Sequence, residues 1–150
     1  MILHAFTDGA SRGNPGESGI GVIVKDDRGQ VLYRLHGYIG TSTNNRAEYT
    51  ALLTLLEQIR EVRCESVLVH SDSELMVRQV TGRYKVKDGE IRKYHARVMA
   101  ILADVPFRFA IKHVPRGENA DADRLANLAI DTRTALVPAP FPPLPPESGR

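Results

Sequence analysis

Short apolar stretches separated by polar and glycine-rich segments occupy the first forty residues, which is typical of β-strands. Apolar runs predict three strands, at residues 2–8, 19–25 and 30–39. Asp26–Gly29, between the second and third strands, has turn chemistry, so we expect those two strands to form an antiparallel hairpin. The chain is therefore expected to begin as an antiparallel meander.

From residue 45 onward the spacing of apolar residues changes to every third or fourth position. This period predicts helices at residues 45–63, 73–81, 90–103 and 119–132. Two short strands, at residues 66–70 and 107–114, lie between them. The order β-β-β-α-β-α-α-β-α is typical of an α/β domain in which helices flank a mixed sheet.

Composition and charge narrow the class of protein. A chain of 150 residues with 42% apolar and 25% charged residues can bury the core of one globular domain. No long apolar run and no secretory signal are visible, so we expect no membrane partner. Cys64 is the single cysteine, which fits a reducing compartment, and we expect a cytoplasmic protein.

Basic residues are concentrated in one part of the chain, although the net charge is only +2. Between residues 83 and 97, six lysines and arginines occur against two acids, with two tyrosines among them. This pattern indicates either a solvated helix face or a surface that meets phosphates, and charge alone leaves both open.

Prolines dominate the C-terminal end of the chain, which reads PAPFPPLPPESGR from residue 138. Proline has no backbone N–H to give to a helix or sheet. We therefore expect one domain over residues 1–135 and an extended, disordered tail over residues 136–150 with polyproline II character. The tail either keeps the protein soluble or binds a protein partner.

Four acids stand at the ends of predicted elements, where a sheet and its helices can converge. Asp8 closes the first predicted strand, Glu48 lies one turn into the first long helix, and Asp72 follows the fourth strand. Asp123 lies near the start of the last helix. Gathered acids need a cation, and hard divalent ions prefer oxygen ligands. Each acid could instead cap a turn or a helix, so spacing alone does not decide.

The chain resembles type 1 ribonuclease H from residue 4 to about residue 132. The resemblance is carried, in order, by TDGASRGNPGESGIGVIV, TNNRAEYTALL, HSDSELMVRQVTGRY and HVPRGENADADRLANLA. It implies a five-stranded mixed sheet of order 3-2-1-4-5. It also implies hydrolysis of the RNA strand of RNA–DNA hybrids, with two Mg²⁺ ions that Mn²⁺ can replace, leaving 5′-phosphate and 3′-hydroxyl ends.

The resemblance also assigns residues. The implied metal ligands are Asp8, Glu48, Asp72 and Asp123, with Asp121 as the rival for the last position. The implied substrate contacts are Ser11, Arg12, Gly13, Asn14, Thr43, Asn44, Asn45, Lys85 and Lys87. Glycines let a backbone approach a ligand closely, and asparagines can both donate to and accept from a 2′-hydroxyl.

Two features depart from the family pattern. His113 stands at the position of a histidine that assists proton transfer or product release, although Arg116 or Glu118 could take that role. The segment 82–97 is shorter than the basic protrusion of many relatives and has no tryptophan. Some relatives without the protrusion accept other duplexes that contain RNA, so the resemblance also allows duplex RNA as a second substrate.

Alternative interpretations are a nuclease of the same fold that cuts duplex DNA and a non-catalytic module that binds hybrids. We expect a free-standing monomer rather than a domain attached to a polymerase.

Overall fold

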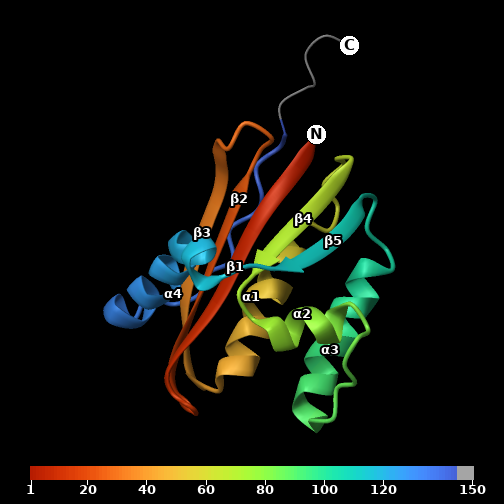
Figure 1. The fold of residues 1–150 in the computed structure, drawn as a ribbon. Coiled ribbons are helices and arrows are strands. Elements are labelled where there is room, and N and C mark those ends of the chain that lie inside the picture. The colour runs from red at the N-terminus through yellow and green to blue at the C-terminus, as the bar shows by residue number, and fades with distance from the viewer. Residues whose placement is uncertain (145–150) are drawn as a thin grey trace.

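Five strands form one mixed sheet of order β3-β2-β1-β4-β5 in the computed structural model, which describes residues 1–144 (Figure 1). The strands are β1 (Ile2–Gly13), β2 (Gly16–Lys25), β3 (Val31–Ser42), β4 (Ser66–Ser71) and β5 (Arg108–His113). The first three are antiparallel neighbours, while β4 runs parallel to β1 and β5 runs parallel to β4. The expected strand order and meander are confirmed.

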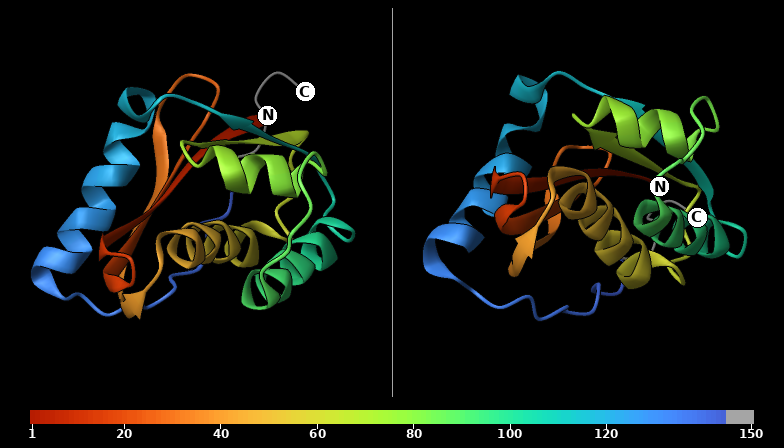
Figure 2. Two further views of the ribbon diagram at one scale, coloured as in Figure 1. Left: turned by 60° about the horizontal axis from the view of Figure 1, so that its bottom comes forward. Right: turned by 90° about the horizontal axis from the view of Figure 1, so that it is seen from below.

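Helices cover both faces of the sheet. They are α1 (Asn44–Ile59), α2 (Glu74–Val80), α3 (Gly89–Leu102) and α4 (Ala120–Thr132), the last preceded by a 3-10 turn at Arg116–Asn119. Helix α1 packs on one face with α2 and α3 beside it, and α4 packs on the other face (Figure 2). Within residues 1–144, no helix is both long and apolar enough to cross a membrane.

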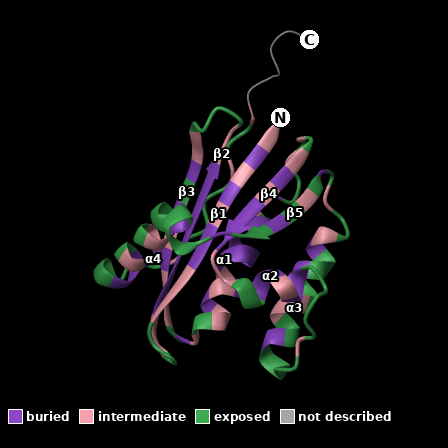
Figure 3. Ribbon diagram, viewed as in Figure 1, coloured by how far each residue is buried: buried purple, intermediate pink, exposed green. Residues whose placement is uncertain are grey.

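The hydrophobic core lies between α1 and the sheet, where the buried positions gather (Figure 3). Leu3 and Ala5 of β1, Val22 of β2 and Leu52 of α1 are fully buried there. Alternate residues of β1 point to the opposite face, because side chains of a strand alternate. This alternation decides which acids can meet, since Asp8 falls on the face opposite Leu3 and Ala5.

The first strand is longer than its sequence predicts. We expected it to end at Asp8 and a loop to follow, but β1 continues to Gly13 and β2 begins at Gly16. The small residues after Asp8 pair with β2, and the hydroxyls of Ser11 and Ser18 lie 2.6 Å apart. Asp8 is therefore in the middle of a strand, and only the short segment around Asn14 turns.

The proline-rich segment differs in part from expectation. Residues 136–144 form no helix or strand, but they pack against the domain rather than being disordered. The hydroxyl of Tyr33 donates to the carbonyl of Ala139 over 2.5 Å, and the ring of Phe141 lies 5.3 Å from that of Tyr33. Leu136 packs directly on Gly37 of β3, and a Cβ added at Gly37 would stand 2.5 Å from the Cβ of Leu136. The expected disorder of residues 145–150 concerns a part of the chain outside the described residues.

Candidate active site

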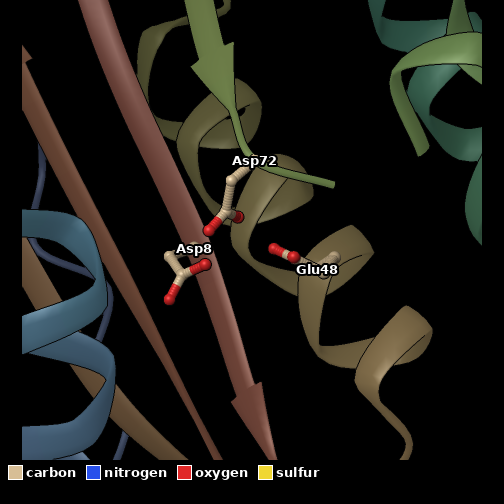
Figure 4. Close-up of side chains that lie close together, drawn as sticks. All are labelled: Asp8, Glu48 and Asp72. Atoms are coloured by element: carbon tan, nitrogen blue, oxygen red, sulfur yellow. The ribbon is translucent and has the colours of Figure 1, made fainter. Parts of the chain in front are cut away.

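Three of the four predicted acids lie close together in the structure. Asp8 comes from β1, Glu48 from α1 and Asp72 from the end of β4, and their side chains point toward one another (Figure 4). One carboxylate oxygen from each lies within 4.8 Å of the others. Residues 64 positions apart in the chain thus form one cluster of oxygen ligands.

Strand register brings Asp8 and Asp72 together. Phe6 of β1 is the parallel partner of His70 in β4, so the residues two positions later, Asp8 and Asp72, fall side by side on the same face. Neither acid could reach the other if the register were shifted by one residue, because each side chain would then change faces.

Gly9 brings the third acid into the cluster. Its N–H donates to Oε1 of Glu48 over 2.8 Å. A Cβ at this position would stand 2.2 Å from the carbonyl carbon of Ala47, so only glycine lets α1 approach β1 this closely. This is one purpose of the small residues after Asp8.

Asp123 and Asp121, the two candidates for the fourth ligand, lie on different sides of α4. Asn119, almost fully buried, donates through Nδ2 to the carbonyl of Thr7 over 2.9 Å and thereby fixes the start of α4 against β1. Asp123 then lies near enough to Asp8 to add, after burial and the charges of Glu48 and Asp72, to the rise in the pKa of Asp8. Asp121 instead points to the surface and pairs with Arg124 over 2.8 Å.

Burial and mutual repulsion disfavour the state in which all three carboxylates of the cluster are ionised. Burial, followed by the charges of Glu48 and Asp72, raises the pKa of Asp8 to about 10. Burial and the charge of Asp72 raise the pKa of Glu48 to about 8, although the Gly9 N–H and the charge of Arg116 oppose this shift. A divalent cation would offset this repulsion, so the donor set fits a hard metal ion bound by carboxylate oxygens.

His113 is not one of the three clustered residues, although it is the β5 partner of Ser71, which directly precedes Asp72. It is exposed at the end of β5 and lines a hollow with Glu74 and Arg78. The residue that the structure places beside the acids is Arg116, whose Nε lies 3.8 Å from Oδ2 of Asp72. Glu118 lines a separate hollow that includes Phe6.

The turn between β1 and β2 and the start of α1 form one continuous surface. Oδ1 of Asn14 accepts a hydrogen bond from the N–H of Asn44 over 3.1 Å. Thr43 caps α1 by accepting from the N–H of Arg46 over 3.3 Å. Oδ1 of Asn45 is buried and has no hydrogen-bond partner within residues 1–144, which leaves an acceptor unused.

The remaining predicted contacts are divided between two places. Ser11 and Gly13 lie at the turn end of β1, whereas the guanidinium of Arg12 turns to α4 and pairs with Asp131 over 2.7 Å. Lys85 and Lys87 are exposed and line a hollow of about 430 Å³. Tyr84, Arg92 and His95 share that hollow.

The sequence did not predict the polar residues that connect α4 to β1 next to the acids. Asn119 and Asn127 both occur in the motif NADADRLAN, where they read as ordinary helix residues. Their role depends on partners in β1, which are more than a hundred residues away in the chain. Local sequence carries no signal for such contacts.

Comparisons with known proteins identify the family and the fold of this chain. A family model described as "Reverse transcriptase-like" matches residues 6–129. The crystal structure of LC11-RNase H1 in complex with RNA/DNA hybrid is similar to this chain, with a TM-score of 0.83 and 42% identity. That match covers 87% of this chain and 98% of the other.

Two curated relatives are longer than this chain. Ribonuclease HI of Halobacterium salinarum is 37% identical over 129 residues, which is 86% of this chain and 64% of the relative. Bifunctional protein Rv2228c of Mycobacterium tuberculosis is 38% identical over 144 residues, or 95% of this chain and 39% of the relative. The chain thus spans between about two fifths and just under two thirds of these relatives.

Proposed function

Because this chain belongs to the type 1 ribonuclease H family, we propose that it is an endonuclease that hydrolyses the RNA strand of RNA–DNA hybrids and leaves 5′-phosphate and 3′-hydroxyl ends. The observation that carries the proposal is the cluster of Asp8, Glu48 and Asp72, whose carboxylate oxygens lie within 4.8 Å of one another. The relative solved with a hybrid supports the substrate class.

The four acids would hold two Mg²⁺ ions, or Mn²⁺ in their place. When bound, such ions activate a water and neutralise charge on the phosphate that is cut. The chain itself supplies the positions of the ligands: β1 and β4 hold Asp8 and Asp72 side by side, and Gly9 draws in Glu48. Arg116, beside Asp72, is in place to meet a phosphate oxygen or a leaving product.

Recognition of the RNA strand would use the turn around Asn14 and the start of α1. Asparagine amides can both donate and accept, as the 2′-hydroxyl does, and Asn45 offers a buried oxygen without a partner in the described part of the chain. Thr43 would help to seat a phosphate of the DNA strand. Lys85 and Lys87 would add phosphate contacts, so affinity should fall steeply with salt.

The short basic segment leaves duplex RNA as a second candidate substrate, because fewer exposed contacts are available to select the DNA strand. A non-catalytic binding module would be expected to lack part of the acid cluster, whereas all four acids are present in this chain. A cytoplasmic location, a monomeric state and a protein partner for the proline-rich segment stay predictions.

The test uses strand-labelled RNA–DNA hybrid, duplex RNA and duplex DNA, with Mg²⁺, Mn²⁺ or chelator. We expect cleavage of RNA in the hybrid, none with chelator, and loss of cleavage in Asp72→Asn. Asp104→Asn, an exposed acid outside the cluster, is the matched control and should cleave normally. Cleavage of duplex DNA, or binding of hybrid without any cleavage, would overturn the proposal.

A further inference from the structure

Asn127 holds the carboxylate of Asp123 from the next turn of α4. Its Nδ2 donates to the backbone carbonyl of Asp123 over 3.0 Å and to the carboxylate Oδ1 over 3.3 Å. Both residues are half-buried. One side-chain amide therefore fixes the carboxylate of Asp123 relative to the helix that carries it.

Arg12 determines which end of this amide faces Asp123. Its Nη2 donates to Oδ1 of Asn127 over 3.2 Å, while its Nη1 pairs with Asp131 over 2.7 Å. A guanidinium can only donate and an ionised carboxylate can only accept. The amide of Asn127 lies between one of each, so only one of its two orientations makes both hydrogen bonds.

On the basis of the proposed function, we propose that Arg12 and Asn127 are positioning residues that orient Asp123 for binding a divalent cation. Arg12 then acts through Asn127 rather than by touching the hybrid. The exposed ion pair with Asp131 contributes little energy by itself, because both side chains are about half exposed. Its effect is to keep the guanidinium at the amide.

The arrangement also connects two parts of the site. Arg12 stands at the turn end of β1, next to the residues expected against the hybrid, while Asp123 lies near Asp8. Asn127 is the link between them. Outer partners of metal ligands commonly change metal affinity by about ten- to a hundredfold when they are removed.

The experiment compares Asn127→Ala, Arg12→Met, Arg12→Lys and the double variant of Asn127→Ala with Arg12→Met. Arg124→Met is the matched control, because it removes an arginine–aspartate pair on the exposed side of the same helix. Calorimetric titration with MnCl₂ in the absence of hybrid measures metal affinity. Cleavage rates over a series of hybrid concentrations, at several MgCl₂ concentrations, give kcat and the KM for hybrid, and thermal unfolding in chelator checks the fold.

We expect Asn127→Ala to weaken Mn²⁺ binding about tenfold and Arg12→Met to weaken it less, with KM for hybrid unchanged in both. Arg12→Lys should restore binding, since lysine is also only a donor. The double variant should bind Mn²⁺ no more weakly than Asn127→Ala, because both residues act along one path.

Two results would overturn the inference. One is wild-type Mn²⁺ affinity in Asn127→Ala. The other is a raised KM for hybrid with unchanged Mn²⁺ affinity in Arg12→Met, which would make Arg12 a substrate contact. If the wild-type protein cleaves no hybrid, the proposed function fails while the calorimetry still decides this inference.

Discussion

Replacing Asp8 with asparagine should stabilise the metal-free protein while abolishing cleavage. Asp8 lies within 4.8 Å of two other carboxylates. Each ionised neighbour at that distance costs about 3.5 kcal/mol at an effective dielectric constant of about 20. Asparagine has a similar shape and carries no charge, so it removes the repulsion and keeps the packing.

The raised pKa of Asp8 gives a second estimate of the same effect. A carboxyl whose pKa rises on folding contributes stability below its unfolded pKa of 3.8, and this is lost as pH rises toward its folded value of about 10. Each pH unit in that window costs about 1.4 kcal/mol, so by pH 7 the loss approaches about 4 kcal/mol. Because the surrounding structure relaxes, we expect a smaller effect. Asp8→Asn should raise the free energy of unfolding by about 2–4 kcal/mol at pH 7, which corresponds to roughly 5–10 °C in Tm.

The assay is urea or thermal unfolding with chelator at pH 5 and pH 8, for wild type, Asp8→Asn and the surface control Asp104→Asn. The gain of Asp8→Asn should be small at pH 5 and larger at pH 8, and the control should change by less than about 0.5 kcal/mol. Saturating Mn²⁺ should stabilise the wild type more than Asp8→Asn. If Asp8→Asn is no more stable than the wild type at pH 8 without metal, the reasoning about a repulsive cluster is wrong.

Three further predictions concern the site and the C-terminal segment. Gly9→Ala should lower the stability measured by urea unfolding by about 1–3 kcal/mol and remove most of the cleavage rate. The reason is that a Cβ at this position would stand 2.2 Å from the carbonyl carbon of Ala47. Wild-type stability and cleavage in this variant would contradict the close approach of β1 and α1. Phe141→Ala should lose about 1–2 kcal/mol with cleavage unchanged, because the ring packs on the core away from the acids; an unchanged urea midpoint would mean that residues 136–144 do not pack there in solution. Arg116→Ala should lower kcat about tenfold whereas His113→Ala should leave it unchanged, and the reverse order in steady-state assays would return the role to His113.

The periodicity of the chain predicted most of the fold because the elements are patterned locally. Strand alternation, the helical spacing after residue 45 and the turn at Asp26–Gly29 each lie within a short window. The length of β1 was the exception. Glycine, serine and arginine after Asp8 look like a loop, and only pairing with β2 shows that they continue the strand.

The position of His113 shows the same limit at the site. The sequence places His113 at the family's separation from Asp123 but does not show where its side chain lies. In the structure, β5 continues as far as His113, which lines a hollow with Glu74. Whether a strand ends before or after a residue decides the face on which the residue lies, and sequence rarely fixes that boundary. The packing of Phe141 on Tyr33 was likewise invisible, because the two are distant in the chain.

The sequence by itself determined which chemistry is available: four acids in four ordered motifs, the order of strands and helices, and the family to which they belong. Tertiary structure decided which of these residues meet. Register between β1 and β4 joined Asp8 to Asp72, the close approach at Gly9 added Glu48, and Asn119 fixed the start of α4 against β1. These are contacts between distant segments, and their geometry depends on the packing of the whole sheet rather than on any local pattern.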